Sequence, residues 1–161
     1  MNNPTDSRPN AWLLDFGQTL RAAVGMRVML QIMDNPKLHA IPCTPPHCRH
    51  VFSWQGRLLP VVDMAVILGN APQKPHLLAV AGYHEHPGDP TRFGAFLLSA
   101  PPVAIIVGND QECALPDPQE EWNRFSVSCF GHHGDAVPVL HLSRIFSRLQ
   151  AAQSLHPGIA P

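Results

Sequence analysis

Proline is the residue that most limits how this chain can fold. The sequence holds 18 prolines among 161 residues, about twice the number that an ordinary usage of roughly 5% gives. Between Pro36 and Pro118 they recur at short intervals. Because a proline inside a helix removes a hydrogen bond and clashes with the preceding turn, a helical bundle is excluded there. We expect short strands joined by turns.

Charge and hydropathy limit the kinds of partner. Charged residues make up 14% of the chain and the formal net charge is -1, which leaves little electrostatic attraction for nucleic acid or an anionic membrane. The longest uncharged stretch, residues 94–109, is too short to span a bilayer. The first ten residues lack the apolar run of a signal peptide. We therefore expect a soluble, cytoplasmic protein without membrane insertion, whose four cysteines are reduced thiols.

Three segments carry the strongest strand pattern, namely residues 12–16, 51–62 and 103–107. The middle segment is expected to be a hairpin, because Gly56 lies between two apolar runs and can adopt the positive φ of a tight turn. Residues 26–33 fit helical and strand spacing equally well, so periodicity leaves both readings open.

The residues after this hairpin turn predict a second local motif. Pro60 cannot donate a hydrogen bond to a neighbouring strand, so it should lie at a sheet edge or a bulge. Asp63 is expected to cap a single helical turn. Gly69 is expected to end that turn, because glycine readily adopts the left-handed conformation of a helix C-terminus.

The chain also contains an internal repeat, since residues 56–68 align without a gap with residues 134–146. Gly134 and Pro138 of the second segment recur at the same spacing as the glycine and proline of the first. A fainter match relates residues 12–17 to residues 77–82. The sequence therefore predicts two similar β units.

We expect the first unit at about residues 11–70 and the second at about 75–146. A C-terminal helix capped by Ser143 is expected from residue 144 to about 153, because its apolar residues form one stripe. Residues 147–161 should hold the end of this helix and a flexible tail.

A group of histidines and cysteines within twelve residues suggests metal or thiol chemistry: His39, Cys43, His47, Cys48 and His50. Imidazole and thiolate are the ligands that zinc prefers, but this spacing is not a standard zinc pattern and prolines interrupt it. Neither these cysteines nor Cys129 lie in the local signature of a catalytic cysteine. We therefore predict no metal, no cofactor and no catalytic residue. A small metal- or thiol-dependent enzyme that uses the His39–His50 cluster stays as the less favoured alternative.

Residues 41–69 resemble a known signature. The motifs I-P, T-P, V-F-S-W-Q-G-R-L-L-P-V-V-D-M and L-G follow one another at the spacing typical of CheW-like domains, the adaptor modules of bacterial chemosensory arrays. The resemblance implies that residues 1–161 form a single CheW-like domain. Its fold would be mainly β, with two SH3-like five-stranded β barrels in tandem, a groove between them, and short helices that include the C-terminal one.

The resemblance also implies a function. Members of this family are non-enzymatic adaptors that bridge a histidine kinase regulatory domain and a chemoreceptor signalling tip, or the equivalent pair in a pilus-type motility system. A divergent CheW-like fold that binds an unrelated protein is the second reading.

The departures from the family pattern concern the partner surface. Gln31 and Gln55 stand where relatives usually have a glutamate and an arginine that meet the kinase and the receptor. Since exposed charge pairs contribute at most about 1 kcal/mol to folding, the fold should survive while partner choice changes. Burial statistics favour packing over exposure for Trp54 and Trp122. The implied partner-binding residues are Met29, Gln31, Ile32, Ser53, Trp54, Gln55 and Gly56.

Overall fold

The computed structural model describes residues 8–147. Over this range the chain is mainly β, with a few short helices, as expected. The strands are β1 (Ala11–Asp15), β2 (Arg21–Gly25), β3 (Met29–Asp34), β4 (Leu38–Ala40), β5 (His50–Trp54), β6 (Arg57–Val62), β7 (Leu77–Tyr83), β8 (Arg92–Leu97), β9 (Ala100–Ile105), β10 (Ser126–His132) and β11 (Asp135–Leu140). The helices are α1 (Met64–Ile67), the 3-10 turn η1 (Asn109–Gln111) and α2 (Gln119–Phe125).

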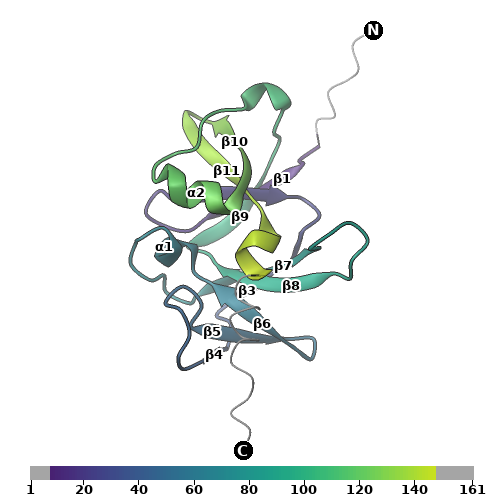
Figure 1. The fold of residues 1–161 in the computed structure, drawn as a ribbon, viewed down its shortest axis with the longest axis vertical. Helices are drawn as coiled ribbons and strands as arrows, with labels where there is room; N and C mark the ends of the chain where they lie inside the picture. Colours follow the sequence, from purple (N-terminus) through teal and green to yellow (C-terminus); the bar gives the residue numbers. More distant parts are fainter. Residues whose placement is uncertain (1–7, 148–161) are drawn as a thin grey trace, which may run out of the picture.

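These strands form two curled sheets, which Figure 1 shows one above the other. The first has the order β10-β11-β2-β1-β9 and the second the order β3-β7-β8-β6-β5-β4. The expectation of two SH3-like β units is confirmed, but the second sheet has six strands instead of five. The additional strand is the three-residue β4, which pairs with β5 through Leu38, His39 and Ala40.

The two sheets do not follow the two halves of the sequence, which corrects the expected barrel boundaries of residues 11–70 and 75–146. The hairpin β1–β2 joins β9, β10 and β11, while the hairpin β7–β8 joins the strands of the first half. Two parallel contacts hold this exchange: Val139 of β11 pairs with Ala23 of β2, and Val61 of β6 pairs with Ala95 of β8. Each half of the chain therefore gives its first hairpin to the sheet of the other half.

The internal repeat is confirmed, because both sheets have the same order once β4 is set aside. The sequence β5-β6-β8-β7-β3 corresponds to β10-β11-β2-β1-β9. The two equivalent hairpins even share a turn geometry. Gln55 and Gly56 have φ angles of 48° and 73°, and His133 and Gly134 have φ angles of 49° and 85°. Two consecutive positive φ values define the type I′ turn that suits a two-residue hairpin.

The repeated prolines also occupy equivalent places. Pro60 pairs with Val51 of β5, and Pro138 pairs with Cys129 of β10. Both prolines lie in strands that have neighbours on either side, so the expectation of a sheet edge or a bulge is wrong. The parallel pairing on the second side begins one residue after the proline in each case. A missing N–H therefore costs the sheet no hydrogen bond at either site.

Most central strands are buried on both faces, because the molecule has three hydrophobic clusters. One fills the six-stranded sheet around Phe52, Leu78 and Leu97, and another fills the five-stranded sheet around Leu13, Phe130 and Val137. The largest lies between the sheets and includes Leu14 of β1, Phe16 directly after it, Ala79 of β7, Phe96 of β8, Trp122 of α2, and Phe146. Its apolar surface is what holds the two units together. Trp122 is fully buried there, as packing statistics predicted.

The expected helical turn after Pro60 is present as α1, and Asp63 is its N-cap. The carboxylate is buried and accepts a hydrogen bond from the backbone N–H of Ala65 at 3.1 Å. It also accepts bonds from the backbone N–H and the side-chain amide of Gln73, at 2.8 and 2.9 Å. Gly69 ends the turn with φ 82°. Asp63 therefore ties α1 to the connection that leads into β7.

Replacing Asp63 with alanine is expected to lower the free energy of unfolding by about 2–3 kcal/mol, since three donors lose their carboxylate acceptor at a buried site. Urea denaturation at neutral pH measures the change. Asp63→Asn should lose less, because one acceptor oxygen remains. Asp34→Ala, which removes an exposed carboxylate on β3, is the matched control. Equal losses in Asp63→Ala and Asp34→Ala would contradict this role.

The helices differ in part from the expectation. The C-terminal helix begins at residue 142. The backbone N–H groups of Arg144 and Ile145, in its first turn, donate hydrogen bonds to the carbonyl of His141. His141 therefore takes the capping place that was expected for Ser143. The expected continuation of this helix beyond residue 147 and the expected flexible tail lie outside the described residues. Helix α2 was not expected. Residues 29–34 form a strand, which decides between the two readings that periodicity left open for this segment.

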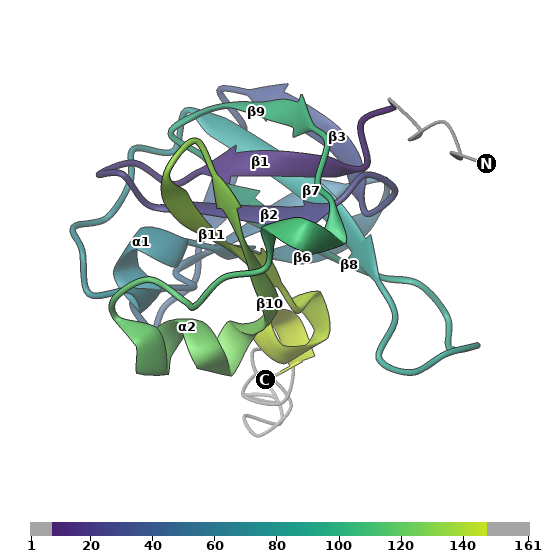
Figure 2. The ribbon, with the colours of Figure 1, turned by 90° about the horizontal axis from the view of Figure 1, so that it is seen from above.

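Figure 2 shows α1, α2 and the C-terminal helical turn on the same side of β1 and β2. Between residues 8 and 147 no helix is long and apolar enough to cross a membrane.

Candidate interaction surfaces

The first candidate surface is an aromatic cluster at one end of the interior of the six-stranded sheet, formed by Gln31, Trp54, Arg57 and Phe93. The indole N–H of Trp54 donates a hydrogen bond of 2.8 Å to Oε1 of Gln31. The ring of Trp54 lies 5.1 Å from that of Phe93, and the guanidinium of Arg57 lies 4.9 Å from the same ring, within cation–π range. We call these four residues the tryptophan cluster.

The curl of the sheet produces this cluster. Gln31 lies on β3 and Trp54 on β5, two strands that lie far apart in the order of the sheet. Met33 and Phe52, each two residues away on the same strand, belong to the interior cluster of this sheet. Since residues two apart share a face, Gln31 and Trp54 close the end of that interior. Arg57 was not singled out from the sequence, although it supplies a cation to this surface.

The structure separates the remaining residues that were assigned to a partner surface. Gln55 and Gly56 are exposed in the turn next to Trp54. Met29 packs against the central core. Ile32 is exposed but follows Gln31 directly, and Ser53 precedes Trp54 directly, so each lies on the opposite face of its strand from the cluster. The geometry thus supports one continuous patch at Gln31, Trp54, Gln55 and Gly56.

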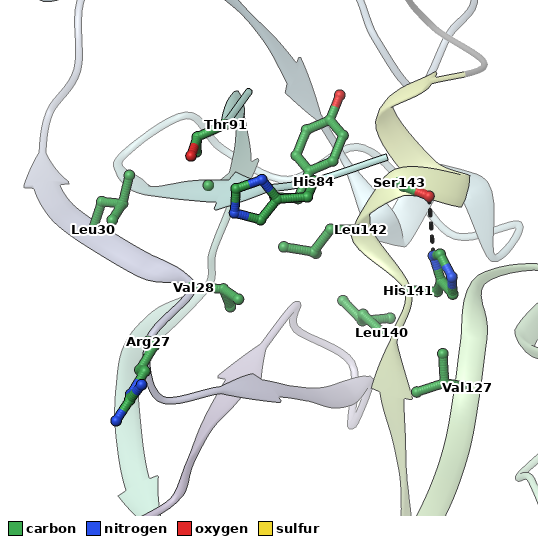
Figure 3. A pocket seen from close by; sticks show the side chains of 12 residues that line it. Arg27, Val28, Leu30, His84, Thr91, Val127, Leu140, His141, Leu142 and Ser143 are labelled. Atoms are coloured by element: carbon green, nitrogen blue, oxygen red, sulfur yellow. Dashed lines mark hydrogen bonds between the residues drawn. The ribbon is translucent and has the colours of Figure 1, made fainter. Parts of the chain in front are cut away.

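The second candidate surface is a groove between the two sheets, with a volume of about 610 Å³. The six-stranded sheet and the turn before it line one side, and β10, β11 and the start of the C-terminal helix line the other. In Figure 3, Val28, Leu140 and Leu142 project into the hollow. The lining residues are Arg27, Val28, Leu30, Gly82, Tyr83, His84, Thr91, Val127, Leu140, His141, Leu142 and Ser143.

Two local features shape the groove wall. Met29 pairs with Ala81 while Gln31 pairs with Val80, so Leu30 is the additional residue of a β-bulge. Leu30 is 46% exposed and lines the groove. Opposite the bulge, a Cβ on Gly82 would lie 3.2 Å from the side chains of Leu30 and Thr91. A larger residue at Gly82 would therefore crowd this wall.

The groove combines an apolar interior with polar edges. Exposed Val127 and Leu30 are the apolar groups most open to a partner. His141 joins the wall to the helix that follows: its Nδ1 lies 3.3 Å from the hydroxyl of Ser143, and this contact is drawn in Figure 3. Neither Leu30 nor His141 was identified from the sequence, because the bulge and the meeting of two sheets leave no local pattern.

The cluster of histidines and cysteines at residues 39–50 does not converge. His39 pairs with Val51, whereas Ala40 pairs with His50, so the two imidazoles lie on opposite faces of the β4–β5 ladder. Between residues 8 and 147, three or more potential ligands lie close together only at Glu85, His86 and Asp89. The geometry therefore does not favour a metal site at residues 39–50.

The two buried thiols, Cys48 and Cys129, also lack the character of catalytic nucleophiles. Burial raises the pKa of the Cys48 thiol to about 11. Burial, together with a hydrogen bond to Cys113, raises the pKa of the Cys129 thiol to about 12. Both thiols are protonated at neutral pH, whereas a catalytic cysteine needs a depressed pKa.

The group at Glu85, His86 and Asp89 is a partly exposed set of paired side chains in the β7–β8 loop. Arg92 lies 3.1 Å from the carboxylate of Glu85, and the hydroxyl of Ser147 donates to it at 2.9 Å. His86 lies 3.0 Å from Asp89. These contacts use the carboxylates to fix the loop.

Comparisons with known proteins agree with the fold and identify the family. The family model of the CheW-like domain matches residues 16–111, more than half of the chain. This protein belongs to the CheW-like domain family. Among solved structures, it is similar to the scaffolding protein TtCheW from Thermoanaerobacter tengcongensis, with a TM-score of 0.66 and 10% sequence identity. That match covers 83% of this chain and 89% of the other. A comparison with curated protein sequences found no match.

Proposed function

We propose that this protein is a non-enzymatic adaptor of a bacterial chemosensory system, which acts in the cytoplasm. In this proposal it bridges a histidine kinase regulatory domain and a chemoreceptor signalling tip, or the equivalent pair of a pilus-type motility system. Membership of the CheW-like domain family is the observation that carries the proposal. The similar fold of a protein described as a scaffolding protein supports it.

The two candidate surfaces fit the needs of an adaptor. The groove offers an open apolar strip with Leu30 and Val127 exposed, which suits the apolar side chains of a partner segment. The tryptophan cluster, whose Gln31 follows Leu30 of the groove on β3, offers a half-buried aromatic ring and a cation. Tryptophan and arginine are the residues most often found to dominate binding energy at interfaces. Two separate surfaces would let two partners bind together.

The Gln31–Trp54 hydrogen bond bears on partner choice. In the family pattern the positions of Gln31 and Gln55 usually carry opposite charges, and here they carry neutral amides. The indole N–H of Trp54 donates a hydrogen bond to the side chain of Gln31. This contact joins two uncharged groups. Since interfacial charges mainly set encounter rate and the rejection of wrong partners, we propose that the protein prefers a partner whose matching surface has also lost charge.

Restoring both charges tests this preference. Wild-type protein should bind the regulatory domain of a conventional chemosensory kinase weakly and with little dependence on salt. Gln31→Glu combined with Gln55→Arg should strengthen binding on the order of ten-fold at low salt, with the gain shrinking as salt screens the charges. Calorimetric titration at two salt concentrations measures both effects, and each single variant should gain less.

The stability of the double variant serves as the control. A glutamate at position 31 still accepts the indole N–H of Trp54, and Gln55 is exposed in the turn, so the melting temperature should be nearly unchanged. Tight wild-type binding that the double variant leaves unaltered would place both glutamines outside the interface.

A second candidate function is an adaptor for an unrelated protein partner on the same fold. Two candidate protein-binding surfaces favour it over an enzyme, and the five residues of the His39–His50 cluster do not converge. Pulldown with kinase and receptor fragments separates the two adaptor functions: capture of neither fragment would favour the unrelated partner.

A further inference from the structure

Two cysteines that lie 16 residues apart in the sequence meet on the outer edge of the five-stranded sheet. The Sγ atoms of Cys113 and Cys129 are 3.4 Å apart. Cys113 is exposed and Cys129 is buried, and both are free thiols. Neither the adaptor function nor the groove uses them, because the groove is lined by other residues.

The backbone holds the two thiols in register. The backbone N–H of Cys113 donates to the carbonyl of Cys129 at 3.0 Å, and Glu112 forms a β-bridge with Phe130 directly beside this bond. The side-chain amide of Gln111 donates to the carbonyl of Gly131. The connection between β9 and α2 is therefore held along β10 by one isolated bridge and the hydrogen bonds beside it.

The surroundings favour a thiol pair over a metal site. A zinc ion needs four ligands as a rule, yet within residues 8–147 no third histidine, cysteine, aspartate or glutamate joins these two in a ligand group. The thiol of Cys129 instead donates to the carbonyl of Ala114 at 3.5 Å. An exposed thiol backed by a buried thiol is the arrangement in which one cysteine meets the oxidant and the other resolves the product.

We propose that Cys113 and Cys129 are an oxidation site that forms a reversible intramolecular disulfide with hydrogen peroxide as the oxidant. The disulfide would fix the β9–α2 connection to β10. The inference is independent of the adaptor function, since it rests on the contacts of these two residues alone.

The reaction balances in two steps. Sγ of Cys113, as thiolate, attacks one peroxide oxygen, an S–O bond forms, the O–O bond breaks, and the departing hydroxide takes up a proton as water. The Cys113 sulfenic acid is then attacked by Sγ of Cys129, which forms the S–S bond while the S–O bond breaks. The hydroxide that leaves accepts the proton of the Cys129 thiol. Two thiols and one peroxide thus give one disulfide and two waters, and a thiol reductant reverses the change.

The experiment treats the purified full chain with hydrogen peroxide, alkylates the remaining thiols and maps peptides without reduction. We expect the four free cysteines to fall to two alkylatable ones, the mass to drop by two hydrogens, and a Cys113–Cys129 cross-linked peptide. The melting temperature should rise by about 5 °C, since the link closes a loop of moderate length, and dithiothreitol should reverse the rise.

Three variants make the result specific. Cys129→Ser should stop oxidation at a Cys113 sulfenic acid that a dimedone probe captures, and Cys113→Ser should leave Cys129 reduced. Cys43→Ser, which removes the other exposed thiol, should leave the cross-link unchanged. Circular dichroism of the reduced variants verifies that each is folded. Peroxide that oxidises Cys43 while Cys113 stays alkylatable would overturn the proposal, and so would a Cys113 disulfide to another cysteine or another chain.

Discussion

Replacing Phe146 with alanine is expected to lower the free energy of unfolding by about 3–5 kcal/mol, the usual cost of truncating a buried aromatic side chain. The ring of Phe146 is fully buried, and its centroid lies 5.0 Å from that of Phe96 and 5.5 Å from that of Tyr83. Phe146 follows β11 of the five-stranded sheet, whereas both partners belong to the six-stranded sheet. The loss therefore falls on the contact between the two units. Urea denaturation followed by circular dichroism measures it.

Gly94 makes this prediction more specific. A Cβ on Gly94 would collide with ring atoms of Phe146, so Gly94→Ala should also be strongly destabilising. When Gly94→Ala is combined with Phe146→Ala, the phenyl ring of Phe146 is absent, so the new methyl group at position 94 has no ring to collide with. The double variant should therefore lose less than the sum of the two single losses. Gly131→Ala, at a strand position where the nearest atom lies 3.9 Å from the new Cβ, is the matched control. Additive losses would show that Gly94 does not support the ring.

In the proposed adaptor we assign the groove to the receptor signalling tip. Replacing Leu30 with aspartate is then expected to weaken binding to a receptor signalling fragment by at least about 30-fold, the effect of losing a central apolar anchor. Leu30 reaches the groove from a bulge and is partly exposed, so its replacement leaves the interior clusters intact. A charge there would have to be desolvated when an apolar partner segment binds. Calorimetric titration of the receptor fragment measures the loss.

The repeat provides a control for this variant. Val103 is exposed on β9, the strand that corresponds to β3 in the other sheet, and it does not line the groove. Val103→Asp should bind the fragment as wild type does, and both variants should melt within a few degrees of it. Equal loss of binding in the two variants would mean that the groove is not the receptor surface.

Local features of this fold could be predicted from the sequence because they depend on neighbouring residues. The turn at Gln55 and Gly56, the cap at Asp63 and the end of α1 at Gly69 each follow from the backbone preferences of one or two residues. The repeat was also visible, because equal spacing of glycine and proline serves the same hairpin twice. The partner of each hairpin was not visible. Strand pairing between β2 and β11 joins residues more than a hundred positions apart, and no local preference encodes it.

The candidate surfaces also combine features that the sequence reveals with contacts that depend on distant strands. The sequence pattern and the family resemblance pointed to Gln31 and Trp54 separately, but their hydrogen bond depends on the curl of a whole sheet. The bulge at Leu30 shifts the register by one residue, which periodicity alone cannot reveal. Helix α2 was missed because it has seven mostly polar residues directly after Pro116 and Pro118. Its burial depends on a single residue, Trp122.

The exchange of hairpins has a consequence for how the protein works as an adaptor. Each sheet contains strands from both halves of the chain, so neither unit can unfold or separate without disturbing the other. The groove between the sheets is therefore held in a fixed shape, which reduces the entropy that a partner must lose on binding. We expect a single cooperative unfolding transition for the two units.

The proposed function is tested most directly by sedimentation velocity of this protein mixed with the kinase regulatory domain and the receptor signalling fragment from the same organism. The proposal predicts one faster-sedimenting species that contains all three proteins, and binary complexes when either partner is omitted. Leu30→Asp should remove the receptor fragment from the complex while the kinase domain stays bound. Failure of both partners to bind, or competition between them for one surface, would contradict an adaptor that bridges the two.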